Sequence, residues 1–593
     1  MGYLLAIAVG PVQDFIAAAR RTRDLWFGSF LLSEISKAVA KCLASKPGVV
    51  LIFPNPDTLE KLNPNGAFNV ANIILAEVTV LEDTEEPYPN RLQSDAKAAA
   101  AQRWESFCAE AMSISEVAAN VRGDLWKQQV QDVVEFYAAW LPYAGPSEYK
   151  VKRADLMRLL AGRKACRDFA CFEGHPLIPK SSLDGARESV LKKEKNTRFP
   201  PRRRLRLNPG EELDAIGVVK RVAGEKRQYP SVSRVAADGW LRGLPDVDVC
   251  QLRKECAALT AEGLAQLNDE RFKNYARFPY EGAAVYKNRV KEITCEEDEP
   301  DPKLNPLRQV LAAITARNGE PDAYFAVLAA DGDFMGRAIA GMDTPDQHRA
   351  FSRILADFAG AAEKVVRDSQ GSLVYAGGDD VLAFLPVDRA LGCARELRQE
   401  FCSVLKQWGL TFSVGIAFGH SMEPLEDLLD AARDAERHAK RPRAEAGDWP
   451  GSIERDALAV HWHSRGAEPV QLRDNWDSKP VERLAMEAAW IEAGWVSTKA
   501  AYGLRQLAAH YSGWPEEKHA EMESALRCEA LCMLKHKIPA EHGETAKQLE
   551  DMIHRRGSTP SALLRLAEEL IVAGKIGDAS SKARPSDQNR GDV

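Results

Sequence analysis

Two short acidic motifs in the second half of the chain have the residue types that phosphoryl transfer uses. Gly377-Gly378-Asp379-Asp380 lies between the apolar runs 372–376 and 381–385, and Asp331-Gly332-Asp333 directly follows the apolar run 324–330. Carboxylates at a turn suit Mg²⁺, and paired glycines let a nucleotide approach the backbone. We therefore predict a divalent-metal site at Asp331, Asp379 and Asp380. The alternative is an ordinary turn rich in Gly and Asp.

The elements around these motifs are predicted to bring the acids together. Thr344, Pro345 and Gln347 form a helix start, and apolar residues then recur at helical spacing up to the second motif. A helix near 389–407, a strand at 410–418 and a helix at 424–440 follow. This order is that of a ferredoxin-like palm, in which neighbouring strands place Asp331 beside Asp379. Two carboxylate clusters on neighbouring strands are the minimum for a two-metal phosphoryl-transfer site.

The N-terminal region repeats the same order of elements. Residues 4–9 are predicted as a strand, 14–41 as one long helix, and 49–53 and 72–78 as two further strands. Where the later unit has its acidic turn, this one has Pro54, Asn55 and Pro56 followed by a loop rich in Asn and Gly. We interpret the region as a second palm that lacks the metal-binding acids. A coincidental α/β pattern is the alternative.

Composition indicates a large globular protein. The chain has 593 residues, of which 45% are hydrophobic and 28% charged, with a net charge of −7. No segment approaches the roughly 18 to 20 apolar residues of a membrane span. Eleven scattered cysteines without an export signal predict reduced thiols and a cytoplasmic location. The negative charge argues against a protein that coats nucleic acid along its whole length.

A basic stretch between residues 192 and 206 is the exception to the acidic character. It contains eight basic residues against one acid, and its prolines predict a loop. Such a loop can follow a phosphate backbone, so we predict contact with RNA or with a partner. A solvated loop is the alternative. The basic residues are Lys192, Lys193, Lys195, Arg198, Arg202, Arg203, Arg204 and Arg206.

Several spaced motifs resemble one family. Residues 10–16 (GPVQDFI) and 20–33 resemble the opening of the large polymerase/cyclase-like subunit of type III-B (Cmr) CRISPR effector complexes. Residues 179–189 and 213–221 resemble its middle region, and the two acidic motifs match its catalytic palm. The resemblance spans roughly residues 1–465. It implies an α+β fold of two palms with helical domains, assembled with other subunits, a guide RNA and a target RNA.

The resemblance also implies an activity for antiviral defence. When target RNA pairs with the guide, the palm would convert ATP into a cyclic oligoadenylate-type second messenger. Asp331 and Asp379 would hold two Mg²⁺ or Mn²⁺ ions, with Asp380 close by and the Gly332 carbonyl as an extra ligand. Lys440 resembles the lysine that cyclase-type palms direct at the triphosphate. The alternative is an exposed lysine at a helix end, favoured by the helix dipole. The residues expected to contact the nucleotide are Gly332, Asp333, Phe334, Gly336, Gly377, Gly378 and Lys440.

The chain departs from the family pattern in two respects. Many members begin with an HD nuclease domain, but no His-Asp dipeptide occurs among the eleven histidines, so a DNase role is not predicted. Members also often carry a cysteine-based zinc site, and the spacings here are looser than usual. Buried free cysteines are the alternative to a zinc site. The possible zinc ligands are Cys166, Cys171, His175, Cys250 and Cys256.

The predicted domain organisation has five parts. They are a degenerate palm at 1–145, a middle helical region at 146–305, the catalytic palm at 306–470, a helical domain at 471–575 and a disordered tail at 576–593. Two other functions remain open, a stand-alone nucleotidyl cyclase and a non-catalytic scaffold of an RNA-guided complex. The degenerate palm and the basic stretch favour a complex over a free cyclase, and the intact acids argue against a scaffold.

Overall fold

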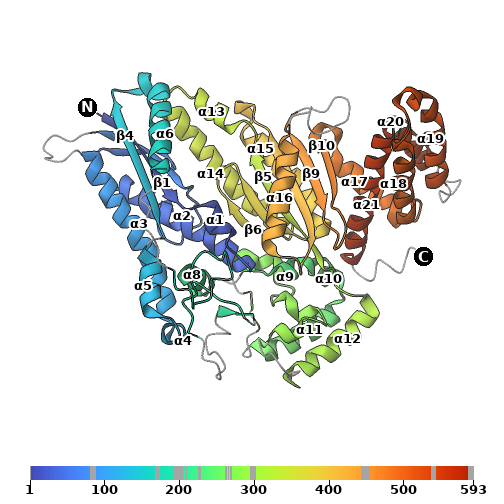
Figure 1. Cartoon of the computed structure of the whole chain (residues 1–593), viewed down its shortest axis with the longest axis horizontal. Helices are drawn as coiled ribbons and strands as arrows, with labels where there is room; N and C mark the ends of the chain where they lie inside the picture. The colour runs from blue at the N-terminus through green and yellow to red at the C-terminus, as the bar shows by residue number, and fades with distance from the viewer. Residues whose placement is uncertain are drawn as a thin grey trace.

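The structure is a computed structural model of the whole chain (Figure 1). The residues that it describes are 2–79, 88–131, 133–166, 174–192, 205–208, 210–224, 229–260, 264, 266–267, 270–293, 302–441, 454–535, 543–557 and 559–584.

The N-terminal sheet has four antiparallel strands in the order β2-β3-β1-β4. Alternate residues of β1 pack into two different apolar clusters, as expected for a strand covered on both faces. Leu5, Ile7 and Val9 pack on the side of α2, and the residues between them pack against α6. The strands are β1 (Gly2–Gly10), β2 (Val49–Phe53), β3 (Ile73–Thr79) and β4 (Glu135–Tyr143). The helices of this region are α1 (Gln13–Ala17), α2 (Thr22–Ala44), α3 (Tyr88–Met112), α4 (Ser115–Ala119), α5 (Gly123–Gln131) and α6 (Tyr149–Ala165).

The second sheet has six strands in the order β10-β9-β8-β5-β7-β6. Its strands β8, β5, β7 and β6 repeat the spatial order β4-β1-β3-β2 of the first sheet, and β9 adds parallel to β8. The strands are β5 (Tyr324–Gly332), β6 (Ser372–Ala376), β7 (Val381–Leu385), β8 (Phe412–His420), β9 (Ala457–Trp462) and β10 (Val470–Asn475). Its helices are α13 (Met335–Gly341), α14 (Pro345–Asp368), α15 (Val387–Val404) and α16 (Leu425–Lys440).

Helices cover both faces of the second sheet. Phe351 of α14 and Phe401 of α15 share a cluster with Leu328 of β5. Leu428 of α16 shares another with Val327 of β5, and that cluster continues into the core of the first palm. The prediction of two ferredoxin-like palms is confirmed. The expected cap of α14 is also present, because the Gln347 N–H donates to Thr344 Oγ1 at 3.3 Å.

One long helix over residues 14–41 was predicted, and this prediction is wrong. The segment forms α1 and α2 with a break at residues 18–21. The buried carboxylate of Asp24 accepts the backbone N–H groups of Arg20 at 3.2 Å and Arg21 at 3.1 Å, which starts a new helix at Thr22. Arg221 of α8 (Ala215–Val222) forms an ion pair with the same carboxylate. Helical periodicity alone gives no sign of this long-range ion pair.

The middle region is helical, but its packing moves both predicted boundaries. Its helices are α8 (Ala215–Val222), α9 (Val232–Ala236), α10 (Asp238–Gly243), α11 (Asp246–Leu259) and α12 (Asn305–Asn318). Leu307 and Leu311 of α12 share an apolar cluster with Leu252 of α11, so α12 packs with the middle region rather than with the palm. Leu156 of α6 belongs to a cluster of the first sheet. The first palm therefore continues past residue 145, and the second begins near β5.

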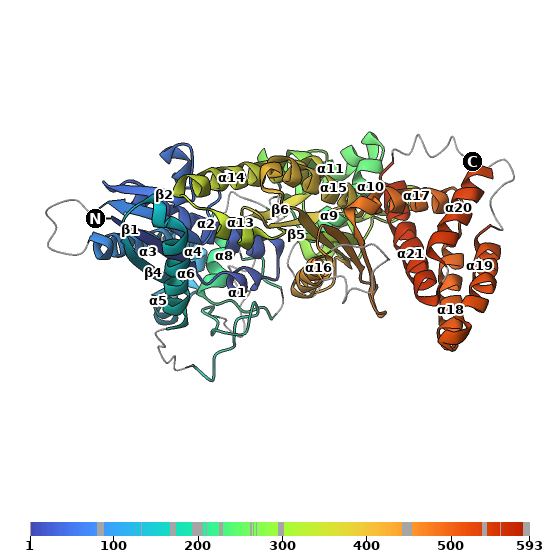
Figure 2. The ribbon, with the colours of Figure 1, turned by 90° about the horizontal axis from the view of Figure 1, so that it is seen from above.

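The C-terminal helices lie at the end of the molecule opposite the N-terminal palm (Figure 2). They are α17 (Pro480–Glu492), α18 (Thr498–Ser512), α19 (His519–Lys535), α20 (Gly543–Arg556) and α21 (Pro560–Lys582). The predicted disordered tail from residue 576 is contradicted up to Lys582, because α21 continues there with Ile576 and Ala579 buried. Small residues such as Gly577 let it lie against α17, a role that a polar composition conceals. Among the described residues, no helix is long and apolar enough to cross a membrane.

Candidate active site

The two acidic motifs meet at one end of the second sheet. Asp331 lies near the end of β5, and Asp379 and Asp380 lie in the turn between β6 and β7. Because β5 pairs with β7 through Ala330 and Val381, the end of one strand lies beside the turn of the other. The Gly332 N–H donates to the Asp379 carbonyl at 3.1 Å, which joins the motifs directly. The antiparallel register therefore brings together the acids that the sequence motifs suggested.

The glycines of the turn are required by its geometry. Gly378 has φ of +113°, in the region that side chains other than glycine rarely adopt. A Cβ on Gly377 would lie 2.5 Å from Asp380 Oδ1. The Gly377 N–H also donates to the Asp380 carbonyl at 3.0 Å, closing the turn. The pair of glycines thus fixes where the two carboxylates project and leaves the backbone of the turn uncovered by side chains.

Burial and neighbouring carboxylates raise the pKa values of both acids of the turn. Burial, followed by the charges of Asp331 and Asp380, raises the pKa of Asp379 to about 8. Burial and the charge of Asp331 raise the pKa of Asp380 to about 6. Like charges held together in a partly buried site disfavour ionisation unless a cation compensates them. The cluster is therefore an electrostatically strained group that a cation would stabilise.

Lys440 supplies one such positive charge. Its Nζ forms ion pairs with Asp331 and, at 2.6 Å, with Glu436 one turn earlier on α16. Burial alone would lower the pKa of Lys440, but the charges of Asp331 and Glu436 outweigh it and raise the pKa. Its side chain is only 18% exposed, so Lys440 is not the exposed helix-terminal lysine of the alternative reading. Sequence reasoning missed Glu436, although its i, i+4 spacing to Lys440 was a usable signal.

The donor set matches a hard divalent cation. Carboxylates of Asp331, Asp379 and Asp380 and the backbone carbonyl of Gly332 are oxygen donors, which Mg²⁺ and Mn²⁺ prefer. Within the part of the chain that the structure describes, no three His, Cys, Asp or Glu side chains are already gathered as metal ligands. Lys440 neutralises Asp331 in this arrangement. The chemistry of these residues therefore fits a cation that would compete with Lys440.

Asp333 has a different position from the one predicted. It is fully buried and accepts hydrogen bonds from Thr411 Oγ1 at 2.8 Å, Ser413 Oγ at 2.9 Å and the Asp456 N–H at 3.0 Å. Its own N–H donates to the Thr411 carbonyl at 2.9 Å. Asp333 was expected to contact the nucleotide, but its N–H and its carboxylate are both already paired within the protein. Asp333 instead ties the end of β5 to β8 and to the segment before β9.

The remaining predicted contacts lie next to Asp333. Phe334 adopts a left-handed φ of 59°, and the guanidinium groups of Arg337 and Arg455 each lie 4.7 Å from its ring centre. Gly336 is exposed in the first turn of α13. The structure therefore packs the ring of Phe334 against two guanidinium groups, and it leaves Gly336 exposed to solvent.

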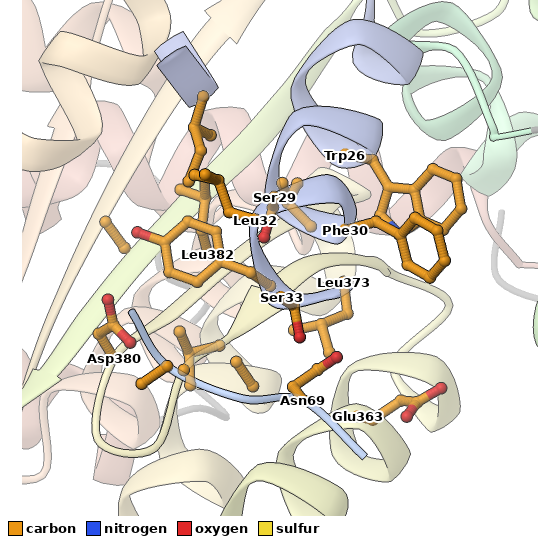
Figure 3. Close-up of a pocket in the computed structure, with 18 of the residues that line it drawn as sticks. Trp26, Ser29, Phe30, Leu32, Ser33, Asn69, Glu363, Leu373, Asp380 and Leu382 are labelled. Carbon is orange, nitrogen blue, oxygen red and sulfur yellow. The ribbon is translucent and has the colours of Figure 1, made fainter. Parts of the chain in front are cut away.

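A cavity of about 980 Å³ lies between the two palms, and Asp331 and Asp380 line one side of it. In Figure 3, Ser29, Ser33 and Asn69 lie on the first-palm side, and Leu373 and Leu382 lie on the second-palm side with Asp380. Trp26 and Phe30 of α2 stack with ring centres 5.5 Å apart at the same cavity. The first palm thus supplies a wall of the site although it lacks the acids. Sequence reasoning did not foresee this use of the degenerate palm.

The basic stretch is described only at its ends. Lys192 is exposed, and Arg206 forms an ion pair with Glu281 at 3.6 Å. Contact with RNA or a partner stays a prediction. Lys193, Lys195, Arg198, Arg202, Arg203 and Arg204 lie outside the described residues.

The described cysteines do not form the zinc site that the resemblance implied. Cys256 is buried in the apolar cluster of the middle region, and burial raises the pKa of its thiol to about 12, which disfavours the thiolate that binds zinc. Cys250 is exposed on the same helix, and Cys166 and His175 are exposed elsewhere. Cys171 lies outside the described residues. Cys166, Cys250 and Cys256 are free thiols, and Cys256 is buried, which agrees with the alternative to a zinc site.

Two family matches cover much of both palms. The Cas10/Cmr2 second palm domain matches residues 324–446, and the N-terminal region of the CRISPR-associated protein Cmr2 matches residues 4–109. The CRISPR system Cmr subunit Cmr2 of Pyrococcus furiosus is 35% identical over 175 residues, which cover 24% of this chain. That match spans only 20% of the relative's length.

Solved structures of the type III-B Cmr-beta complex contain a chain of similar fold. The apo state matches with a TM-score of 0.64 and 14% identity, over 91% of this chain and 77% of that chain. The complex bound to cognate target RNA matches with a TM-score of 0.62 and 14% identity, over 91% and 79%. At this identity the likeness shows a shared fold over most of this chain.

Proposed function

We infer that this chain, a member of the Cas10/Cmr2 family by its N-terminal region and second palm domain, is the large subunit of a type III CRISPR effector complex whose second palm is a metal-dependent nucleotidyltransferase. The observation that carries the proposal is the meeting of Asp331, Asp379 and Asp380 beside a cavity of about 980 Å³. Ligand sites commonly have volumes of about 300 to 1,000 Å³, so this cavity has room for a nucleotide.

The proposed substrate is ATP and the proposed product a cyclic oligoadenylate. Asp331, Asp379, Asp380 and the Gly332 carbonyl would hold Mg²⁺ or Mn²⁺, which would lower the pKa of an attacking 3′-hydroxyl and neutralise the triphosphate. The 3′-oxygen bonds to an α-phosphorus and releases its proton to solvent, while the bond from that phosphorus to the oxygen bridging to the β-phosphate breaks and pyrophosphate leaves. Membership in the family supports this reaction, and the pairing of Lys440 with Asp331 supports a site built to balance charge.

Residues of the chain have distinct tasks in this reaction. The ammonium group of Lys440 can move from Asp331 to an incoming triphosphate, while its ion pair with Glu436 is kept. Gly377 and Gly378 keep the turn free of side chains that would exclude the substrate. Asp333 holds the strand end in place through Ser413 and Thr411. Residues of the first palm form one wall of the cavity in which the substrate would bind.

The proposed partners are the other subunits of the complex, its guide RNA and target RNA. The Cmr-beta complex has been solved with cognate target RNA, which supports this assignment by shared fold. The basic stretch 192–206 is the proposed contact with RNA or with an RNA-bound subunit. A cytoplasmic location follows from assembly with these partners.

The deciding experiment uses the co-expressed complex. ATP and Mg²⁺ are added with matched and with unrelated RNA, and the products are identified by mass spectrometry. Cyclic oligoadenylate made only with matched RNA supports the proposal. Turnover by the isolated chain without RNA would favour a stand-alone cyclase, and a complex that assembles but never consumes ATP would favour a scaffold.

A further inference from the structure

The last turn of α16, which ends at Lys440, is packed against the second sheet at very short range. A Cβ on Gly415 of β8 would lie 2.1 Å from the backbone nitrogen of Glu436, so only glycine permits this approach. Ala435 and Ala439 of α16 form a small cluster with Ala457 and Ala459 of β9. Small side chains on both partners thus let the helix backbone lie directly on the strands.

A third strand holds the same turn by hydrogen bonds. Arg473 of β10 is 7% exposed, and its Nε donates to the carbonyls of His438 at 3.1 Å and Ala439 at 3.3 Å. Its Nη2 donates to the Ala439 carbonyl at 3.2 Å. The last carbonyls of a helix have no partner within the helix, and a guanidinium satisfies them and balances the helix dipole. Arg473 therefore closes the C-terminus of α16 one residue before Lys440.

We propose that Arg473 is a positioning residue for Lys440, acting through the backbone of the last turn of α16. The inference rests on the proposed role of Lys440 in the palm. A lysine side chain is a flexible stem, so the place of its ammonium depends on a fixed backbone. Helix ends fray readily when they are not capped. Arg473 does not line the cavity between the palms, and its hydrogen bonds to the His438 and Ala439 carbonyls join it to α16, so we expect it to act through that helix.

The shape of the arginine matters to this role. Its planar fork reaches two successive carbonyls, whereas a lysine offers a single ammonium on a flexible stem. Arg473→Lys should therefore retain part of the function, and Arg473→Met should lose it. Gln471→Met is the matched control, because Gln471 is an exposed residue two positions earlier on the same strand.

The first test measures the position of Lys440 without relying on catalysis. The folded full chain is treated briefly with an amine-acylating reagent, and labelling of Lys440 is quantified by mass spectrometry against exposed Lys364 of α14. Arg473→Met should raise Lys440 labelling several-fold, Arg473→Lys should give an intermediate value, and Gln471→Met should match the unmodified chain. Unchanged labelling in Arg473→Met overturns the proposal. If Arg473→Met does not fold, the labelling of Lys440 in Arg473→Lys decides. Raised labelling supports the proposal, and unchanged labelling overturns it.

The second test is a double-mutant cycle on ATP turnover in the complex. Arg473→Met should lower turnover on the order of 10- to 100-fold, the range that a small misplacement of a catalytic group costs. In a Lys440→Met background the same change should have almost no further effect, because the group that it positions is gone. Independent losses that multiply would overturn the proposal. A wild-type complex without ATP turnover would refute the proposed function, and the labelling test would still decide the role of Arg473.

Discussion

Asp331, Asp379 and Asp380, the proposed metal-binding acids, differ in their surroundings from Asp333, which belongs to the same motif as Asp331. Burial and mutual repulsion raise the pKa of Asp379 to about 8, so its ionised form is unfavourable in the folded protein. Asp333, two residues from Asp331, has hydrogen bonds from two hydroxyl groups and a backbone N–H. Asp379 therefore destabilises the folded protein but is available to bind a cation, whereas Asp333 stabilises the folded protein.

Replacing Asp379 and Asp380 together with Ala should abolish ATP polymerisation. Removing groups that act at the reacting phosphate is expected to cost on the order of 10³-fold or more in turnover. Assembly should persist, because the turn is only partly buried and its acids destabilise one another. Product analysis and size-exclusion chromatography of the complex provide the measurement. Asp368→Ala, at an exposed acid ending α14, is the control, and normal turnover by the double variant would refute the site.

Asp333→Ala should lower stability. The change leaves the hydroxyls of Thr411 and Ser413 without a buried acceptor, and such losses cost about 1–3 kcal/mol each. Asp379→Ala should leave the midpoint of thermal unfolding unchanged or higher, because it relieves a strained carboxylate. Thermal unfolding of both single variants gives the comparison. An Asp333→Ala variant as stable as the unmodified chain would show that its hydrogen bonds contribute nothing.

Among the elements, α16 connects the sheet to the site. It lies on β8 at Gly415, on β9 through alanines and under Arg473 of β10, and it ends at Lys440. β10 is in turn held to the C-terminal helices, where Arg483 of α17 pairs with Asp474 and, at 3.2 Å, with Glu569 of α21. The edge of the second sheet is therefore one of the elements through which the C-terminal helices contact the structure around the acids.

Gly415→Ala should destabilise the second palm and shift α16. The added methyl would lie 2.1 Å from the Glu436 nitrogen, and overpacking of this kind costs about 1–3 kcal/mol. Unfolding by denaturant measures the effect. Gly392→Ala in α15 is the matched control, because nothing lies within 4 Å of its new Cβ and alanine favours a helix. Equal stability of the two variants would contradict the close approach of α16 to β8.

At the scale of the molecule, side-chain contacts hold the first palm against the second. The Tyr149 hydroxyl of α6 forms a hydrogen bond with Nδ1 of His348 of α14, at an oxygen–nitrogen distance of 2.7 Å. The backbone N–H of Asn55, just after β2, donates to Ser352 Oγ at 3.0 Å. Arg349 of α14 pairs with Glu77 of β3. These contacts fix the wall that the first palm gives to the cavity.

His348 should make the contact between the palms sensitive to acid. Burial, followed by the charges of Arg153 and Arg349, lowers its pKa from 6.5 to about 4. The unfolded chain then binds more protons between these values, so the stability present above pH 6.5 is lost as pH falls towards 4. The limiting slope is about 1.4 kcal/mol per pH unit. Unfolding midpoints from pH 4 to 7 should depend less on pH in His348→Gln but not in the exposed His510→Gln. Identical profiles for both variants would refute this role.

Changing Arg202, Arg203, Arg204 and Arg206 to Ala should weaken binding of RNA or assembly of the complex. Each phosphate contact releases counterions, so the variant should also show a shallower dependence of affinity on salt. Affinity measured at several salt concentrations tests this, with turnover in Mn²⁺ as a check that the palm is intact. An unchanged salt slope together with normal assembly would mean that the stretch is a solvated connector.

The sequence by itself determined three strands of the first palm, the strands β5 to β8 of the second palm and the acidic turn, but it did not indicate β4, β9 or β10. Strand, helix and turn preferences depend on neighbouring residues, so periodicity, the Thr344 cap and the paired glycines were sufficient for residues 324–385. The same local signals failed at residues 18–21, where the ion pair of Asp24 with distant Arg221 ends a helix. They failed again at α21, where packing against α17 orders polar residues.

Only the tertiary structure decided which residues face the site. The first-palm wall, the pairing of Lys440 with Asp331 and the burial of Asp333 all join segments far apart in the chain. Asp331 and Asp333 have the same side chain. The alternation of a strand does not distinguish them, because residues two positions apart are expected to face the same side of the sheet. The difference arises because β8 offers Ser413 and Thr411 to one carboxylate, while α16 brings Lys440 to the other.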